Sequence, residues 1–243
     1  MHIKSSRQQS GTSENKYLSP LILALDTSEL EIAKEWVGET NGLIGAYKLG
    51  LEFFLKFGQT GVRAIQSETD AAIFLDLKLH DIPNTVAAAV SQVATLKTKF
   101  LTVHASGGAA MIQSASNAAP DTDITAVTIL TSLNQEDLEN IGFLGNATER
   151  AVELAKLAVN NGARAIVCSP LEIEAIRNVI PIHISIITPG IRPIASGRDD
   201  QKRTMDPKNA MVAGANYLVI GRPITSQKDK RAATEEILSE ALG

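Results

Sequence analysis

The sequence has little of what several classes of protein require. Its 243 residues include a single cysteine, Cys168, which rules out an internal disulfide framework. Aromatic residues make up only 4% of the chain, and a net charge of −4 comes with lysines and arginines scattered along its length. Because nucleic-acid binding usually needs a basic stripe and stacking platforms, this composition predicts no nucleic-acid partner.

Other absences bear on location. No apolar run approaches the length of a membrane span, so we expect no membrane-embedded segment. The first 17 residues are rich in Ser, Gln, Lys and Asn and lack the apolar core of a signal peptide, which predicts a disordered N-terminal tail over residues 1–17. These features together predict a cytoplasmic protein.

What the chain does have is a high apolar content, 44%, in a regular pattern that no linker interrupts. Short apolar runs typical of strands alternate with segments whose apolar residues have helical spacing. The runs are Leu21–Leu25, Ile44–Leu49, Ala71–Leu79, Phe100–His104, Ile124–Leu130, Ala165–Cys168, Ile182–Ile187 and Tyr217–Ile220. The helical segments include Glu29–Thr40, Ile82–Leu96, Ala109–Asn117, Thr148–Asn161, Leu171–Asn178 and Pro207–Ala213.

Eight strand-then-helix units predict an α/β fold, a (β/α)8 TIM barrel that forms a single domain over residues 18–243. Gly162 and Gly214 stand where two of the helices should end. A doubly wound open sheet is the alternative. Its glycine-rich fingerprint is missing after the first run, where Asp26-Thr27-Ser28 stands instead, so the barrel is favoured.

Polar residues gather at the carboxyl ends of the predicted strands, which is the functional face of such barrels. Charges spread over the chain for solubility alone would not favour one end. The residues at these ends are Asp26, Lys48, Asp76, Lys78, His104, Thr131, Ser132, Arg192, Gly221 and Arg222.

The stretch from Phe74 to Thr85 interrupts an apolar strand with charges. Alternation along an extended strand would put Phe74, Asp76 and Lys78 on one face, with Asp81 just beyond where the chain turns. An unpaired charge on a buried face is costly, so the carboxylate and the ammonium must at least neutralise each other. A purely structural ion pair is the alternative to a catalytic role.

The last strand is followed by Gly221 and Arg222, the place where these barrels commonly hold a phosphate group. The segment from Pro189 to Lys202 is too long for a simple connection and predicts a lid. Its Arg192 and Gln201 could close over a bound anion.

We expect Lys48, Asp76, Lys78 and Asp81 to form one set of alternating charges at the mouth of the pocket. The carboxylates of Asp76 and Asp81 favour the ammonium form of Lys78, which can then donate a proton rather than act as a Schiff-base nucleophile. No His and Cys residues occur at metal-ligand spacing, so we expect no metal site. His80 and His104 are expected to be packed or hydrogen-bonded, and Cys168 to be a buried small side chain.

With these motifs in place, the chain after its tail resembles the bacterial type of the orotidine 5′-phosphate decarboxylase family. The central match runs from Phe74 to Val86. The other matching motifs, in order, are Leu25-Asp26, Tyr47-Lys48-Leu49-Gly50, Leu130-Thr131-Ser132, Thr188-Pro189-Gly190-Ile191-Arg192 and Ile220-Gly221-Arg222.

The resemblance implies a dimeric barrel that converts orotidine 5′-phosphate to UMP and CO₂, the last step of de novo pyrimidine synthesis, without metal or cofactor. It makes Lys78 the proton donor to C6 and Asp76 the carboxylate beside the departing carboxylate, and Asp81 and Thr85 would reach the neighbouring subunit's site. In the resemblance Lys48 also completes the catalytic array of charges. The remaining substrate contacts that it implies are Asp26 and Lys48 to the ribose hydroxyls, Thr131 and Ser132 to the pyrimidine, and Arg192, Gln201, Gly221 and Arg222 to the phosphate, with Pro189 as a further substrate-binding residue.

Two alternatives stay open. A magnesium-dependent 3-keto-L-gulonate 6-phosphate decarboxylase of the same superfamily resembles the chain in its Asp-x-Lys-x-x-Asp core. A non-catalytic module that binds a nucleotide phosphate would keep Gly221 and Arg222, but it would have no need of charges at Asp76 and Lys78.

Overall fold

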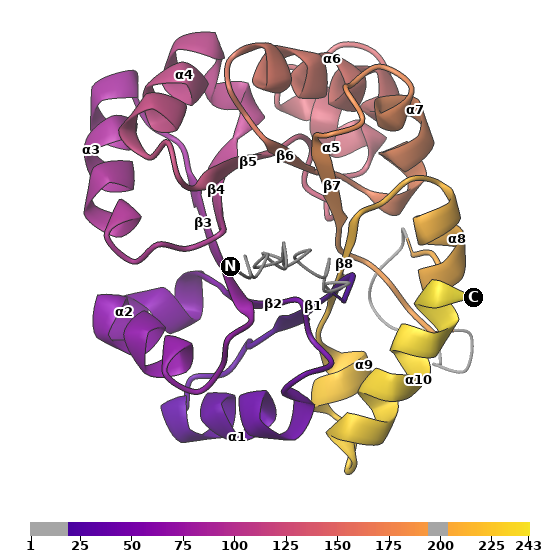
Figure 1. The fold of residues 1–243 in the computed structure, drawn as a ribbon. Helices are drawn as coiled ribbons and strands as arrows, with labels where there is room; N and C mark the ends of the chain where they lie inside the picture. Colours follow the sequence, from indigo (N-terminus) through magenta and orange to yellow (C-terminus); the bar gives the residue numbers. More distant parts are fainter. Residues whose placement is uncertain (1–18, 194–203) are drawn as a thin grey trace, which may run out of the picture.

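The computed structural model describes residues 19–193 and 204–243, which fold into a closed barrel of eight parallel strands in chain order (Figure 1). The strands are β1 (Leu21–Ala24), β2 (Ala46–Leu49), β3 (Ala72–Leu79), β4 (Phe100–His104), β5 (Asp123–Val127), β6 (Ala165–Val167), β7 (Ser185–Thr188) and β8 (Tyr217–Ile220). Pairing of β1 with β8 closes the ring. The (β/α)8 barrel predicted from the sequence is confirmed.

Helices form a ring outside the strands (Figure 1). They are α1 (Leu30–Thr40), α2 (Leu51–Gln66), α3 (Pro83–Ala94), α4 (Ala109–Ala118), α5 (Gln135–Asn140), α6 (Ala147–Asn160), α7 (Ile173–Arg177), α8 (Pro207–Val212), α9 (Arg222–Thr225) and α10 (Lys230–Leu242), with 3₁₀ turns at Ala105–Gly107 and Pro170–Glu172. The C-terminal helix α10 packs against α1, α8 and α9.

The apolar core has two parts. The larger part lies between the strands and the surrounding helices. The smaller part fills the barrel interior and consists of Ile22, Ala46, Phe74, Phe100, Ala165 and Ile187. Phe74 and Phe100 meet edge to face with ring centroids 5.7 Å apart, which is a favourable aromatic geometry.

The predicted strands and the observed ones differ only at their ends. The seventh begins at Ser185 rather than Ile182, whose side chain is 81% exposed in the turn before it. The fifth ends at Val127, after which the backbone N–H of Thr128 still donates to the carbonyl of Val167. Strand periodicity alone does not separate such flanking apolar residues from the ladder.

Glycines end two of the helices as predicted, because Gly162 and Gly214 have φ of 98° and 108°, a left-handed conformation that residues with a Cβ rarely adopt. The tail predicted for residues 1–17 lies outside the described residues. Within the part of the chain that the structure describes, no helix is both long and apolar enough to cross a membrane.

Candidate active site

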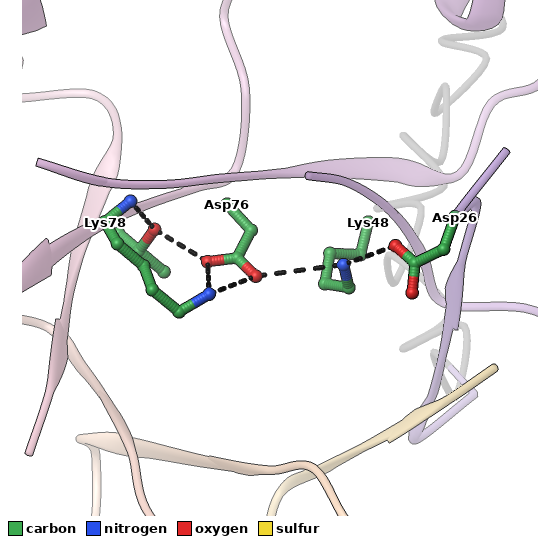
Figure 2. Close-up of polar contacts among 5 residues, drawn as sticks. Asp26, Lys48, Asp76 and Lys78 are labelled. Carbon is green, nitrogen blue, oxygen red and sulfur yellow. Dashed lines mark hydrogen bonds and ion pairs between the residues drawn. The ribbon is translucent and has the colours of Figure 1, made fainter. Parts of the chain in front are cut away.

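Four charged side chains of alternating sign form a connected row at the carboxyl ends of β1, β2 and β3 (Figure 2). The Lys48 ammonium lies 3.0 Å from a carboxylate oxygen of Asp26 and 3.8 Å from one of Asp76. The Lys78 ammonium donates to both carboxylate oxygens of Asp76, at 2.8 and 2.9 Å. Of the four charges that the sequence predicts as one set, Lys48, Asp76 and Lys78 meet in this row, whereas Asp81 does not.

Asp76 is the centre of this row and the most buried of its members, at 9% exposure. Burial is the largest single influence on its pKa and acts to raise it. The charges of Lys48 and Lys78, together with hydrogen bonds from Lys78 and Thr102, outweigh burial, so the pKa of Asp76 lies below its usual value. The carboxylate is therefore held ionised in a poorly hydrated place.

Lys48 approaches the backbone of the loop after its own strand closely. A Cβ placed on Gly50 would stand 3.3 Å from the Lys48 ammonium nitrogen and 3.6 Å from a carboxylate oxygen of Asp26. A side chain at position 50 would crowd this ion pair, which gives a physical reason for glycine in the motif Tyr47-Lys48-Leu49-Gly50.

The sequence expected Phe74, Asp76 and Lys78 to share one face by regular alternation, and all three line one cavity. The strand, however, is not regular. Lys78 has a φ of 48°, and the register between β3 and β4 shifts between Leu75 and Leu79. A left-handed conformation costs about 1–2 kcal/mol for a residue with a Cβ, so neighbouring contacts must hold Lys78 there.

Thr102, in the middle of β4, supplies such contacts and was not predicted. Its hydroxyl accepts a hydrogen bond from the backbone N–H of Lys78 at 2.8 Å and donates one to Asp76 at 3.0 Å. The side chain is fully buried. The only signal in the sequence is a hydroxyl-bearing residue inside the apolar run Phe100–His104.

The cavity beside the charged row has a volume of about 180 Å³. Besides Lys48, Phe74, Asp76 and Lys78, its lining consists of Val127, Ile129, Leu130, Thr131, Pro189, Val167 and Val219. A second cavity of about 180 Å³ shares Lys48, Asp76 and Lys78 with the first and extends past Asp26 and Gly50. The predicted residues Thr131 and Pro189 therefore lie at the site.

The predicted anion-binding residues follow β7 and β8. Gly221 immediately precedes α9, and Arg222 is the first residue of that short helix. The backbone N–H of Arg192 donates a hydrogen bond to the carbonyl of Met205, which joins the segment after β7 to the segment before α8. Gln201 lies outside the described residues.

Three predicted residues lie away from the charged row of their own chain. Asp81 is exposed, and its carboxylate accepts a hydrogen bond of 2.6 Å from the backbone N–H of Ile82. Thr85, in the first turn of α3, is also exposed. Ser132 is exposed and is not part of the cavity lining. Asp81 therefore does not join Lys48, Asp76 and Lys78 within one chain.

Two histidines and the cysteine remain, which the sequence predicts to be packed or hydrogen-bonded side chains. His80 and His104 lie near each other, with ring centroids 5.3 Å apart. Burial, with help from His80 and Lys78, lowers the pKa of His104, so that its ring is neutral at physiological pH. Cys168 is fully buried, as predicted, and burial raises the pKa of its thiol. Among residues 19–193 and 204–243 no three His, Cys, Asp or Glu side chains group as metal ligands.

Comparison with known proteins places this geometry in context. Residues 19–237 match the family described as "Orotidine 5'-phosphate decarboxylase / HUMPS family". The chain is 46% identical over 222 residues to an orotidine 5′-phosphate decarboxylase of Thermobifida fusca, a match that covers 91% of this chain and 95% of the relative. It is 44% identical over 232 residues to the protein of the same name from Paramagnetospirillum magneticum, covering 92% and 98%.

Solved structures agree with this relationship. A crystal structure of orotidine 5′-phosphate decarboxylase from Lactobacillus acidophilus has a TM-score of 0.81 and 34% identity, and the match covers 93% of this chain and 100% of the other. The decarboxylase of Pyrococcus horikoshii has a TM-score of 0.76 at 25% identity, covering 92% and 99%.

Proposed function

This chain belongs to the orotidine 5′-phosphate decarboxylase / HUMPS family, and from that membership we propose how the charged row performs the reaction. The enzyme is a carboxy-lyase that converts orotidine 5′-phosphate to UMP and CO₂ in pyrimidine biosynthesis. Lys78 is the proton donor to C6 of the pyrimidine, and Asp76 stands beside the departing carboxylate. The row Lys48–Asp76–Lys78 next to an apolar cavity is the observation that supports these roles.

The chemistry asks for a fixed cation. Loss of CO₂ leaves an electron pair at C6 in the plane of the ring, outside its π system, so the ring itself stabilises it poorly. An ammonium held next to C6 stabilises that charge and then supplies the proton. Lys78 suits this task because its ammonium is anchored by both oxygens of Asp76.

The carboxylate of Asp76 repels the carboxylate of the substrate, and the loss of CO₂ relieves this repulsion. Two like charges about 4 Å apart at an effective dielectric constant of about 20 repel by roughly 4 kcal/mol, about a thousandfold in rate if fully relieved. That is one part of the acceleration. Binding of the distant phosphate, which positions the pyrimidine against the row, supplies a further part.

The substrate contacts follow the cavity. Asp26 and Lys48 hold the ribose hydroxyls, and Thr131, Ser132 and Pro189 lie along the pyrimidine. Arg192, Gln201, Gly221 and Arg222 bind the phosphate. In support, the shared cavities join Asp26 and Lys48 to Thr131 and Pro189, and α9 starts at Arg222. No metal or cofactor takes part, and the enzyme works in the cytoplasm; cell fractionation tests the location.

We further propose a homodimer in which Asp81 and Thr85 enter the partner's site. Both are exposed; Asp81 lies just before α3 and Thr85 lies in its first turn. The apolar side chain between them, Ile82, is 66% exposed, and Leu51 and Leu55 on the neighbouring helix α2 are 49% and 81% exposed. Apolar surface of this kind beside polar residues is typical of a protein interface.

The decisive experiment is to follow the absorbance of orotidine 5′-phosphate after mixing it with the purified enzyme, with and without EDTA. We expect full turnover in both. If orotidine 5′-phosphate stayed intact, and the enzyme instead decarboxylated 3-keto-L-gulonate 6-phosphate in a reaction that EDTA abolished, the protein would be the magnesium-dependent decarboxylase. Nucleotide binding without turnover would identify a binding module.

Mixing two inactive variants tests the shared site. Lys78→Ala and Asp81→Asn subunits exchanged at equal amounts form about half mixed dimers, each with one intact site, so about a quarter of the wild-type activity should return. Exchange verified by mass spectrometry of differently tagged subunits is the control. No recovery after such exchange would show that Asp81 does not act across the interface.

A further inference from the structure

The two central charges of the site lie in an interruption of the strand pairing. Leu75 pairs with Leu101 and Leu79 with Val103, so three residues of β3 stand opposite a single residue of β4, Thr102. Two of those three residues are Asp76 and Lys78. In a regular parallel pair each residue would face one partner and the backbone ladder would continue.

The side chain of Thr102 replaces the missing backbone partner. Its hydroxyl oxygen lies 2.8 Å from the backbone nitrogen of Lys78 and 3.0 Å from a carboxylate oxygen of Asp76. An N–H can only donate and an ionised carboxylate can only accept, whereas a hydroxyl does both at once. The same group therefore fixes the left-handed backbone of Lys78 and the orientation of the Asp76 carboxylate.

We propose that Thr102 is a positioning residue for the decarboxylation, which sets the geometry of the Asp76–Lys78 pair through its hydroxyl. This inference rests on the function proposed above for that pair. Thr102 does not line the cavity, so it acts through Asp76 and Lys78 rather than on the substrate. Burial strengthens the effect, because at 0% exposure no water can take over either hydrogen bond.

Three variants separate the hydroxyl from the shape of the side chain. Thr102→Val keeps the shape and removes both hydrogen bonds, whereas Thr102→Ser keeps the hydroxyl and removes a methyl group. The matched control is Thr125→Val. Thr125 is the neighbour of Thr102 on β5, is equally buried, and donates its hydroxyl to the carbonyl of Asp123 instead.

For Thr102→Val we expect kcat to fall about 10- to 100-fold, the usual effect of losing a hydrogen bond to a charged group, with KM and the affinity for UMP changing less than about threefold. Thr102→Ser should recover most of kcat, and Thr125→Val should keep it. A readout independent of turnover is ¹³C NMR titration of aspartate carboxyl groups in the enzyme without substrate, with the Asp76 signal identified by its loss in Asp76→Asn. In Thr102→Val the pKa of Asp76 should move up toward its ordinary value.

Hydrogen exchange at the backbone N–H of Lys78 completes the test, because that proton should exchange faster in Thr102→Val and remain protected in Thr102→Ser. The proposal is overturned if Thr102→Ser is as slow as Thr102→Val, or if neither the Asp76 titration nor the exchange of Lys78 changes in Thr102→Val. Should the valine variant not fold, Thr102→Ala takes its place. Failure of the wild-type enzyme to process orotidine 5′-phosphate would instead overturn the proposed function, while the titration and exchange results would still decide what Thr102 does.

Discussion

The two halves of the barrel mouth are built differently. The charged half, on β1 to β4, consists of Asp26, Lys48, Asp76, Lys78 and Thr102, and every member has a hydrogen bond or ion pair to another. The apolar half presents Val127 of β5, Ile129 just after that strand, Val167 of β6 and Val219 of β8 to the same cavity. One cavity is thus bordered by a charged wall and an apolar wall.

The difference shows how a cavity can hold charges that are strong and yet ordered. Charges next to an apolar wall interact through a lower effective dielectric constant than charges in water. The mutual contacts of the charged half hold its side chains in place, and the charges of Lys48 and Lys78 lower the pKa of Asp76, so that its carboxylate stays ionised beside the apolar wall. Substitutions in the charged half should therefore change the rate, whereas those under the apolar half should change stability.

The largest effect should come from Lys78→Ala. We expect kcat to fall by about 10⁴-fold or more, because in the proposed mechanism Lys78 is both the cation beside C6 and the proton donor. Binding of UMP, measured by calorimetry, should remain. Lys99→Ala is the matched control, since Lys99 is ion-paired to Asp123 and precedes β4 at the opposite end of the barrel. Loss of UMP binding in Lys78→Ala would remove Lys78 from the chemical step.

A core substitution beneath the apolar half should have the opposite profile. Ile187 is fully buried in the barrel interior, and Ile187→Ala should lower the free energy of unfolding by about 2–5 kcal/mol because it leaves a cavity. The kcat of the folded enzyme should change little. Urea denaturation measures the first quantity, and Ile182→Ala, at an 81% exposed position before the same strand, should be nearly neutral. A large fall in kcat with unchanged stability would break the division between the two halves.

The smallest expected effect is a pH dependence of stability that arises from His104, the last residue of β4 in the charged half. Burial, then His80 and Lys78, lower the pKa of His104 below 6.5, against the opposing influence of Asp76. Below that pH the unfolded chain binds more protons than the folded chain, so stability should fall as pH drops below 6.5 and be unaffected by this group above it.

His104→Gln should flatten this dependence, which urea midpoints at about pH 7.5 and about pH 5.5 would reveal. The exposed His183 provides the control, because His183→Gln should leave the dependence as it is in the wild type. An equal flattening by both substitutions would show that the pH effect does not arise at the charged half.

The sequence predicted much of the fold because the barrel repeats a simple pattern. Each strand is an apolar run, and the working residues stand at its carboxyl end, so Asp26, Lys48, Asp76 and Lys78 could be brought together without a structure. Gly162 and Gly214 marked helix ends because their φ values need glycine. The strands and the helix ends depend on local sequence. The meeting of the charged residues follows from the rule that the carboxyl ends of all strands lie at one end of a barrel.

What the sequence could not predict depends on pairing between strands. Thr102 is one threonine in an apolar run, and nothing local shows that it faces three residues of β3. The positive φ of Lys78 was also hidden, because lysine gives no signal for a left-handed conformation. Alternation placed Asp76 and Lys78 on the correct face, but not at the separation that lets one ammonium reach both carboxylate oxygens.

The irregular pairing of β3 has a consequence for enzyme design. A designed barrel with Asp76-Leu77-Lys78 on a regular strand would have the same sequence but not the same site. Uninterrupted pairing between two strands has no place for the two additional residues of β3. The transferable unit spans two strands: a three-residue bulge on one and, opposite its centre, a buried hydroxyl on the next. Scaffold searches for this chemistry should therefore screen for a neighbouring strand that can carry that hydroxyl.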